Sequence, residues 1–460
     1  MARRNHLPPF ELELDALGPR GVAVGTAPDG RAVAVRGAPP GARIAVVPTG
    51  RSKGGWTARR TATVRPPAAM AAPRCAQFGL CGGCTLQELD LAGQRAAKQA
   101  LALAEIGAAT PLEGVRVHPI RGADAAYGYR NKVELSFGVR RYVSEADKAA
   151  GAPLDGRFLG FHAPGRFDRV VDAPRCELVS EGGNEVLARV RAVALAPDAP
   201  PPRDPQTHQG FWRHLGLREH HGGRLVVVYT ADDRAGAPWV ERIAQDLDGL
   251  AATVEWRVGD HVADVARGEV ARRWGPATVD ERLLGKVFAL SATAFFQTNT
   301  PGTEVLYRTV GEALQADGGT LWDLYCGVGS IGIVLADRFE RVRGVEENPE
   351  SVRDAGINAM RNEIDGEYRT AKVEDVLPDV AGDVVVVDPP RAGLHPKVAA
   401  AVGQADWRAL VYVACNPAAL GRDAEILRAG GARLTDLWPV DLFPQTGHVE
   451  VVARFERDRP

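Results

Sequence analysis

From about residue 291 to the C-terminus, short apolar segments alternate with stretches of helical character, and this alternation admits few folds. The apolar segments are LWDLYC, RVRGVE, VVVV and LVYVAC, followed by RLTDLWPVD and HVEVVARF. Strands that alternate with helices form a parallel sheet with helices on its faces. We therefore predict an α/β domain over residues 291–460, with four parallel strands and a terminal antiparallel pair.

A glycine-rich turn follows the first of these segments, in the sequence DLYCGVGSIG that begins at Asp323. Glycines between a strand and a helix let the backbone approach a bound nucleotide closely. Glu346 ends the next segment, where a carboxylate can accept hydrogen bonds from both hydroxyls of a ribose. The glycine spacing also occurs in dinucleotide sites, but Asp323 and the terminal hairpin favour S-adenosylmethionine.

The segment DPPRAG begins at Asp388, directly after VVVV. This position lies at the carboxyl edge of the predicted sheet, where ligands bind in such folds. Methyltransferases that act on exocyclic amines usually have an aromatic residue after Asp-Pro-Pro, to stack on the base. Arg391 stands there instead, so the sequence argues against that reaction.

Cys415 and Glu450 are the candidate reactive groups. Cys415 ends the LVYVAC strand, and a thiolate can add to a ring carbon where an unactivated hydroxyl cannot. Glu450 lies on the closing strand, where an apolar residue is otherwise expected, and its carboxylate can remove a proton. A pyrimidine C5 needs thiolate addition at C6 before it can take a methyl group. A cysteine, a base and a cofactor pocket therefore predict pyrimidine C5 methylation.

The other notable cysteines are grouped. Three lie in CAQFGLCGGC at residues 75–84, and a fourth follows 92 residues later: Cys75, Cys81, Cys84 and Cys176. Four thiols can hold a [4Fe-4S] cluster or tetrahedral zinc, and the absence of two CxxC pairs favours iron–sulfur. Six cysteines in 460 residues do not make a disulfide scaffold. We assign Cys326, in the glycine turn, to packing alone.

The N-terminal part has a different pattern. Residues 10–66 contain five short strand-like segments with turn signals between them, which predicts a small β-barrel over residues 1–68. Twelve basic and four acidic side chains lie between Met1 and Arg74, a net charge of +8 in a chain whose total is −2. Such a region suits a polyanion. Residues 69–290 form a mixed central domain in this division.

No apolar stretch is long enough for export or for a membrane span, so we expect a cytoplasmic protein without membrane contact. No segment indicates a protein partner.

Together the motifs resemble a known family. The segments CAQFGLCGGCTLQ, YRNKVE, FFQTN, DLYCGVGSIG, DPPRAGL, ACNP and HVEVV resemble, in the same order, the RNA uracil-C5 methyltransferases that act on 23S ribosomal RNA or transfer RNA. The resemblance implies an OB-like TRAM barrel that binds RNA, a central α+β iron–sulfur domain and a class I, Rossmann-like methyltransferase domain that uses S-adenosylmethionine.

The resemblance also implies roles for individual residues. Cys415 is the expected nucleophile and Glu450 the base that removes the C5 proton. The expected cofactor contacts are Gln297, Tyr325, Gly327, Gly329, Glu346 and Asp388, and the expected cluster ligands are Cys75, Cys81, Cys84 and Cys176. Lys372 departs from the family, because it stands where an acidic or amide side chain usually approaches the adenine.

The expected reaction is formation of 5-methyluridine in 23S rRNA, because the barrel and the cysteine set accompany the ribosomal branch more often. The alternatives are methylation of the transfer-RNA T-loop and a non-catalytic RNA-binding or RNA-folding role, which would not require the thiol and the carboxylate. Pyrimidine methylation in DNA lacks the usual proline before the nucleophile, since Ala414 precedes Cys415. The target base must leave its stack, with Tyr129, Phe295, Phe296 and Phe443 as candidate stacking partners.

Overall fold

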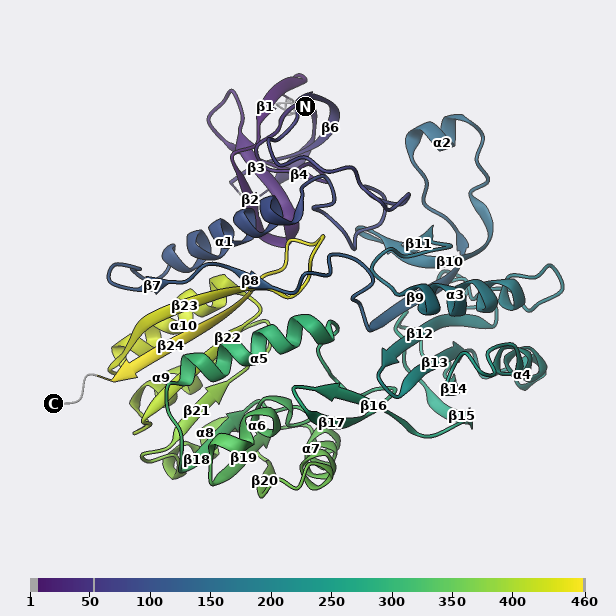
Figure 1. Cartoon of the computed structure of the whole chain (residues 1–460). Coiled ribbons are helices and arrows are strands. Elements are labelled where there is room, and N and C mark those ends of the chain that lie inside the picture. The colour runs from purple at the N-terminus through teal and green to yellow at the C-terminus, as the bar shows by residue number, and fades with distance from the viewer. Residues whose placement is uncertain (1–6, 53, 458–460) are drawn as a thin grey trace.

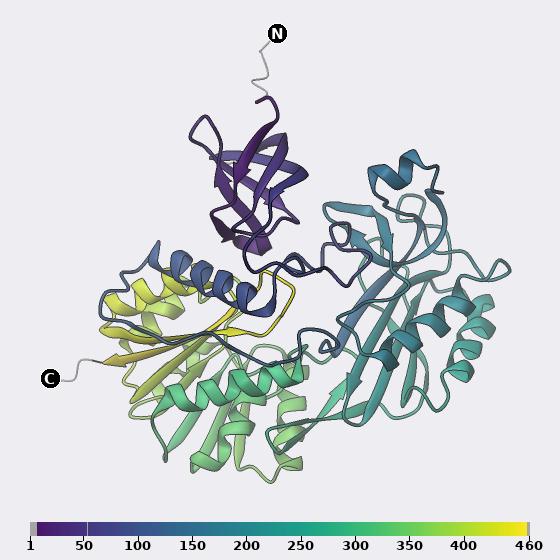
Figure 2. The same ribbon diagram turned by 45° about the horizontal axis from the view of Figure 1, so that its top comes forward.

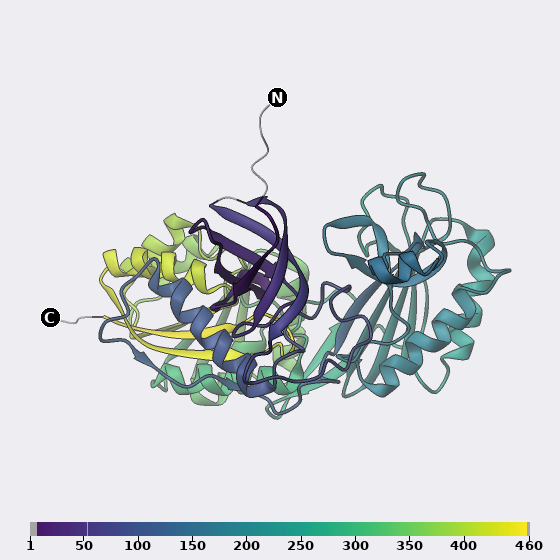
Figure 3. The ribbon, with the colours of Figure 1, turned by 90° about the horizontal axis from the view of Figure 1, so that it is seen from above.

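The structure is a computed structural model that describes residues 7–52 and 54–457. It contains three main sheets, which follow one another along the chain (Figure 1). The N-terminal strands form a small unit that lies above the other two, and the central and C-terminal sheets lie side by side beneath it (Figure 2). Seen from above, the small unit lies over the C-terminal part rather than over the central sheet (Figure 3).

The N-terminal sheet has six strands in the order β1-β5-β6-β4-β3-β2. Its edge strands, β1 and β2, are consecutive pieces of one extended segment, so the sheet closes on itself as a barrel. The barrel therefore has six strands where the sequence pattern predicted five, because residues 10–18 form two of them. The strands are β1 (Phe10–Glu13), β2 (Ala16–Gly18), β3 (Val22–Thr26), β4 (Ala32–Arg36), β5 (Arg43–Ser52) and β6 (Gly55–Arg65).

The barrel interior follows from the alternation of apolar and polar residues along these strands. Val33, Val35 and Ile44 are fully buried in it, as expected when successive side chains point to opposite faces. Trp56 is buried at the rim, where its indole N–H donates to Asp29 at 3.1 Å. Arg51 lies over the Trp56 ring, 5.0 Å from its centroid. Trp56 thus belongs to the barrel core rather than to an exposed RNA-binding surface.

The central sheet has seven strands in the order β11-β10-β9-β12-β13-β14-β15. The strands are β9 (Lys132–Arg140), β10 (Asp155–Ala163), β11 (Arg166–Asp172), β12 (Trp212–His220), β13 (Gly223–Thr230), β14 (Thr253–Val258) and β15 (Glu269–Trp274). Helices α3 (Glu181–Ala194) and α4 (Ala237–Asp246) cover one face, and α2 (Glu145–Ala149) lies in the β9–β10 connection (Figure 1). The hairpin of β16 (Thr278–Leu283) and β17 (Lys286–Ser291) leads into the last domain.

The C-terminal sheet runs β20-β19-β18-β21-β22-β24-β23, with five parallel strands and an antiparallel β24. Its strands are β18 (Thr320–Leu324), β19 (Arg341–Glu346), β20 (Gly366–Thr370), β21 (Val384–Val387), β22 (Ala409–Ala414), β23 (Ala432–Asp441) and β24 (Glu450–Arg457). The helices are α5 (Thr300–Leu314), α6 (Ser330–Leu335), α7 (Pro349–Arg361), α8 (Val373–Val376), α9 (Pro396–Gln404) and α10 (Pro417–Ala429).

Two features of this sheet differ from the prediction. The parallel strands number five rather than four, because GEYRT forms the edge strand β20; its polar composition gave no apolar run to detect. The segment that contains α1 (Leu91–Gly107), β7 (Arg116–Val117) and β8 (Arg121–Gly122) packs on the C-terminal sheet, since β7 and β8 pair with β23. The range 69–290 is therefore not one spatial unit.

A small apolar cluster fixes the barrel to the C-terminal domain. Leu17 of β2 packs with Leu86, Leu89 and Leu101, all nearly inaccessible to solvent. Burying such side chains stabilises the contact by about 1.5–3 kcal/mol each when they are fully removed from water. Arg60 of β6 adds a bidentate ion pair with Glu88, at 2.7 and 2.9 Å.

Among the described residues, no helix has the length and apolar character needed to cross a membrane.

Candidate active site

The carboxyl ends of the parallel strands bring the expected reactive residues to one edge of the C-terminal sheet. Asp323 lies near the end of β18, and Glu346 ends β19. Asp388 directly follows β21, and Cys415 directly follows β22. Because β18 pairs with both β19 and β21, and β21 pairs with β22, these positions are neighbours along the edge. This is where ligands bind in open α/β sheets.

The strand register places Cys415 opposite Glu450. Strands β22 and β24 are antiparallel, and Ala414 pairs with Val451. One further step along the register brings Cys415 across from Glu450. Glu450 is 4% exposed and Cys415 is partly exposed. A thiol that a substrate can reach therefore lies beside a buried carboxyl.

The electrostatics of this pair follow from burial and from neighbouring carboxyls. Burial and the Asp388 carboxyl raise the pKa of Glu450 to about 8, against the opposing effect of Arg391. Burial, Glu450 and Asp388 raise the pKa of Cys415 to about 11. Burial and the nearby Asp323 raise the pKa of Asp388 to about 7. In the resting site the thiol is protonated, and Glu450 is tuned to exchange a proton near neutral pH.

The glycine turn after β18 has features of a ligand site. Asp323 is fully buried, and one of its oxygens accepts the Gly332 N–H at 2.8 Å while the other has no partner. Burial raises its pKa to about 7. Tyr325 has a φ of 65°, a left-handed conformation that costs on the order of 1–3 kcal/mol and clusters at functional sites.

Around this turn the donor set fits S-adenosylmethionine. Gly327 has a φ of 55° and open space where a side chain would stand, so a ligand can approach its backbone. Glu346, at the end of the next strand, accepts the Asn348 N–H at 2.9 Å, and its carboxylate suits ribose hydroxyls. Gly329 is the N-cap of α6. The buried Asp323 carboxyl, with its free oxygen, suits a cationic amino group.

The FFQTN loop is held by the central part of the chain. Buried Arg218 of β12 donates to the carbonyls of Ala292 and Ala294, without a carboxylate partner among the described residues. The Asn131 amide donates to the Gln297 carbonyl at 3.2 Å, and the Gln297 side chain is half-buried. Phe295 is 70% exposed.

The other candidate stacking partners behave differently from Phe295. Phe296 is buried against Phe288, with ring centroids 5.7 Å apart. Tyr129 is buried, and its hydroxyl donates to the Pro444 carbonyl at 2.8 Å. Phe443 is partly buried. Phe296 and Tyr129 are therefore core residues in this structure, whereas Phe295 is exposed and Phe443 is partly exposed beside His448.

A cavity of about 250 Å³ opens beside the thiol, and sequence reasoning missed several of its residues. His448 lies 3.4 Å from the Arg391 guanidinium, and burial together with nearby cations lowers its pKa to about 4. It is therefore neutral at physiological pH. The Asn416 amide donates to the Arg391 carbonyl at 2.9 Å. In the sequence, only the position of His448 two residues before Glu450 could have indicated that it lies at this site. The residues around it in space, such as Arg391, are distant in the sequence.

A buried ion pair anchors the chain just before Glu450. The Lys98 ammonium of α1 donates to Asp441 at 2.5 Å and to the Phe443 carbonyl at 2.9 Å, and both charged side chains are fully buried. Gln94, on the same helix, accepts the Gln445 N–H at 2.7 Å. These bonds hold residues 442–449, which lead directly into Glu450 and of which Gly447, His448 and Val449 line the cavity.

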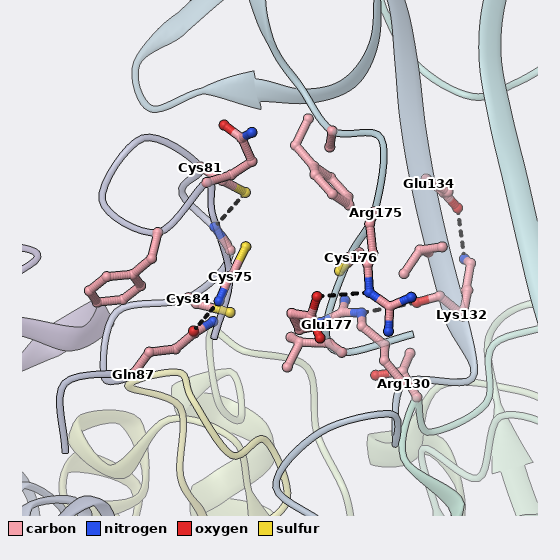
Figure 4. Close-up of a pocket in the computed structure, with 18 residues that line it drawn as sticks. Cys75, Cys81, Cys84, Gln87, Arg130, Lys132, Glu134, Arg175, Cys176 and Glu177 are labelled. Carbon is pink, nitrogen blue, oxygen red and sulfur yellow. Dashed lines mark hydrogen bonds and ion pairs between the residues drawn. The ribbon is translucent and has the colours of Figure 1, made fainter. Parts of the chain in front are cut away.

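The four grouped cysteines line a separate cavity of about 360 Å³. Cys75, Cys81 and Cys84 come from one loop, and Cys176 faces them from the other side (Figure 4). Burial raises the pKa of Cys81 to about 11 and that of Cys84 to about 12. Within residues 7–52 and 54–457, no three His, Cys, Asp or Glu side chains come close enough for one metal ion.

Lys372 directly precedes α8 and is exposed. In the described chain no hydrogen bond or ion pair holds its side chain. A lysine also cannot supply the acidic or amide contact that the family usually makes at this position.

Comparison with known proteins agrees with this geometry. Residues 291–406 match the family described as "Methyltransferase small domain", and residues 366–457 match "tRNA (Uracil-5-)-methyltransferase". An uncharacterised RNA methyltransferase of Chlorobaculum tepidum is 36% identical, over 84% of this chain and 83% of its own length. One of Porphyromonas gingivalis is 32% identical, over 92% of this chain and 94% of its own length.

A solved structure extends the likeness to nearly the whole chain. It is the Pyrococcus abyssi tRNA (uracil-54, C5)-methyltransferase in complex with S-adenosyl-L-homocysteine. It is 26% identical, covers 97% of this chain and 100% of its own, and superposes with a TM-score of 0.77.

The C-terminal sheet and its site thus define a class I S-adenosylmethionine-dependent methyltransferase, an enzyme that modifies RNA. Within that class, the chain belongs to the RNA uracil-C5 methyltransferase family. The non-catalytic alternative is set aside, because the family consists of enzymes and because this chain carries both the thiol and the carboxyl.

The register between Cys415 and Glu450 predicts how the thiol reacts with an alkylating reagent. Glu450→Gln removes a negative charge beside the thiol, so the pKa of Cys415 should fall and alkylation at pH 9 should accelerate about threefold or more. Mass spectrometry of the peptide containing Cys415 separates it from the other five cysteines. Glu105→Gln is the matched control, because Glu105 lines the same cavity and does not affect that pKa. Equal rates in wild type and Glu450→Gln would contradict the facing arrangement.

Proposed function

We propose that the protein forms 5-methyluridine in 23S rRNA through a covalent bond between Cys415 and C6 of the target uracil. The observation that carries the proposal is the antiparallel register that puts a reachable thiol opposite a buried carboxyl, next to the glycine turn. The family supplies the reaction class, and the paired groups supply a route for it.

The proposed reaction uses these two residues in turn. Cys415 gives its proton to water, and its Sγ forms a bond to C6 while the C5=C6 π electrons move onto C5 and the O4 carbonyl; the thiolate released at the end takes a proton back. C5 then forms a bond to the methyl carbon, whose bond to the donor sulfonium breaks and leaves a neutral thioether. Glu450 removes the C5 proton, the C5=C6 bond reforms, and the thiolate leaves. The net products are 5-methyluridine, S-adenosylhomocysteine and a proton.

Transfer RNA is the second candidate substrate, and the comparisons give it specific support. The Pyrococcus abyssi enzyme is named for uracil-54 of tRNA, and it aligns with 97% of this chain, so its likeness extends over the barrel region. A barrel of this kind therefore does not separate the two classes of RNA. The proposal of 23S rRNA therefore rests on the cysteine set, which accompanies the ribosomal branch more often.

Mapping 5-methyluridine in RNA from a strain that lacks this gene tests the choice of substrate. We expect one position in 23S rRNA to lose its methyl group while the transfer-RNA T-loop keeps its own. Restoring the wild-type gene should restore the mark. Loss of the T-loop methyl with 23S rRNA unchanged would establish the second candidate instead.

Cys415→Ala is expected to lower methylation by roughly a thousandfold or more while RNA binding survives, because the thiol supplies a bond rather than charge. RNA that carries 5-fluorouridine should trap the wild type as a stable adduct, because fluorine at C5 cannot leave as a proton does. The adduct should be absent with Cys415→Ala, and Glu450→Gln should accumulate an adduct with ordinary uridine. Normal methylation by Cys415→Ala would require another nucleophile.

We also propose that Cys75, Cys81, Cys84 and Cys176 hold a [4Fe-4S] cluster. The four cysteines surround a cavity of about 360 Å³, which has room for a cluster of several atoms. A bound cluster would stabilise the thiolates that burial disfavours. Its part would be structural, because the proposed reaction has no redox step.

Protein purified without oxygen should contain about four iron atoms and four acid-labile sulfides per chain. Cys176→Ser should lower both contents, because it removes the ligand on the far side of the cavity. Cys326→Ser is the control, since Cys326 lies in the glycine turn away from that cavity. One zinc per chain without iron would contradict the proposal.

A further inference from the structure

The barrel reaches into the cavity beside Cys415 with one turn. Residues Pro19–Gly21 connect β2 to β3, and Pro19 and Arg20 line the same cavity as the thiol. Arg391, Asn416 and His448 line the same cavity. The N-terminal barrel therefore forms part of the wall of the catalytic cavity rather than lying apart from it.

Two glycines fix this turn in place. A side-chain carbon on Gly21 would lie 2.1 Å from the Thr85 hydroxyl and 3.1 Å from the Gly447 nitrogen. One on Gly447 would lie 2.2 Å from the Gly21 Cα. The two backbones are therefore in direct contact, and the nearby Leu17 cluster holds the barrel against the same region. The position of Arg20 relative to Cys415 is set by this contact rather than by a flexible linker.

Arg20 itself is held in an unusual conformation without a partner. Its φ of 60° and ψ of 25° are left-handed, a region that non-glycine residues rarely adopt. Its side chain is exposed, and within the described chain no hydrogen bond or ion pair engages the guanidinium. Three other barrel arginines are paired with carboxylates: Arg43 with Glu11, Arg60 with Glu88 and Arg65 with Glu13. A strained backbone that presents a free cation to a catalytic cavity points to a ligand.

The remaining charged groups of the cavity define what that ligand is. Glu105, the one carboxylate among the residues that line it, accepts the Ala418 N–H at the start of α10. Arg391 is in contact with the neutral His448, and its charge opposes the rise in the pKa values of Cys415 and Glu450. Of the two cations that line the cavity, Arg20 is therefore the one whose side chain has no hydrogen-bond partner in the described chain. A single-stranded RNA whose uracil lies at Cys415 brings phosphodiesters on both sides of the target, and a guanidinium binds a phosphate through two parallel N–H bonds.

We propose that Arg20 binds a backbone phosphate of the RNA directly next to the target uridine, so that the barrel turn Pro19–Gly21 completes the substrate site of the catalytic domain. This inference rests on the proposed function, since it takes a uracil at Cys415 as given. It assigns the barrel a specific contact at the reaction centre, in addition to any general attraction between its basic residues and RNA.

The test uses the full-length protein and Arg20→Gly, because glycine adopts a φ of 60° freely and the turn should keep its shape. Thermal unfolding should show no loss of stability. The substrate is first an unmodified transcript of 23S rRNA or tRNA that the wild type methylates, and then a short fragment around the methylated uridine. In two versions of the fragment, a neutral methylphosphonate replaces the phosphodiester on one side or the other of that uridine.

One of the two replacements should lower the wild-type kcat/KM about tenfold or more. Arg20→Gly should show the same loss with the unmodified fragment, mainly through KM, and little further loss with the modified one. Arg59→Ala is the matched control. Arg59 is an exposed barrel arginine without an ion pair in the described chain, and it does not line the cavity. It should therefore keep the wild-type response to the methylphosphonate.

The outcomes separate this inference from the proposed function. If the wild type methylates RNA and Arg20→Gly still loses activity on methylphosphonate replacement as the wild type does, the phosphate contact is overturned and the proposed function stands. If neither replacement affects the wild type, the contact is overturned in the same way. If the wild type methylates neither 23S rRNA nor tRNA, both proposals fail together.

Discussion

The buried pair of Lys98 and Asp441 is the interaction on which the geometry of the site depends. Both side chains are fully inaccessible to solvent, and the ammonium also binds the Phe443 carbonyl. Removing one partner of such a pair typically costs about 3–5 kcal/mol, because the other charge stays buried alone. The pair joins α1 to the end of β23. It therefore fixes the start of the loop formed by residues 442–449, which leads into Glu450.

This loop also contacts three other regions of the chain. Gly21 of the barrel touches Gly447, and the N–H groups of Thr85 and Leu86, next to the cysteine loop, donate to the Gln445 carbonyl. Tyr129, just before the central sheet, donates to the Pro444 carbonyl. Three regions far apart in sequence thus determine where the chain enters β24. The barrel, the cysteine loop and the segment before the central sheet consequently share in placing Glu450, the proposed general base, although none of them carries it.

The sequence was informative where function depends on local pattern. The apolar segments around β18, β19, β21 and β22 were predicted because buried parallel strands are continuous apolar runs, and Cys415 was found because it ends one of them. Strand β20 was missed because its residues are mostly polar. The attachment of α1 to the last sheet, the Lys98–Asp441 pair and the place of Arg20 were also missed. These contacts join residues hundreds of positions apart, and no periodicity records them.

The raised pKa values explain why the thiol and the carboxyl need to face each other. Burial beside Glu450 and Asp388 raises the pKa of Cys415 to about 11, so at physiological pH the thiol keeps its proton and is a poor nucleophile. A protonated thiol also resists oxidation and stray alkylation. Glu450, with a pKa of about 8, is a stronger base than an ordinary carboxylate. The same burial thus keeps the free thiol protonated and makes Glu450 a stronger base. In the proposed reaction this base removes the C5 proton, and without RNA the thiol stays unreactive.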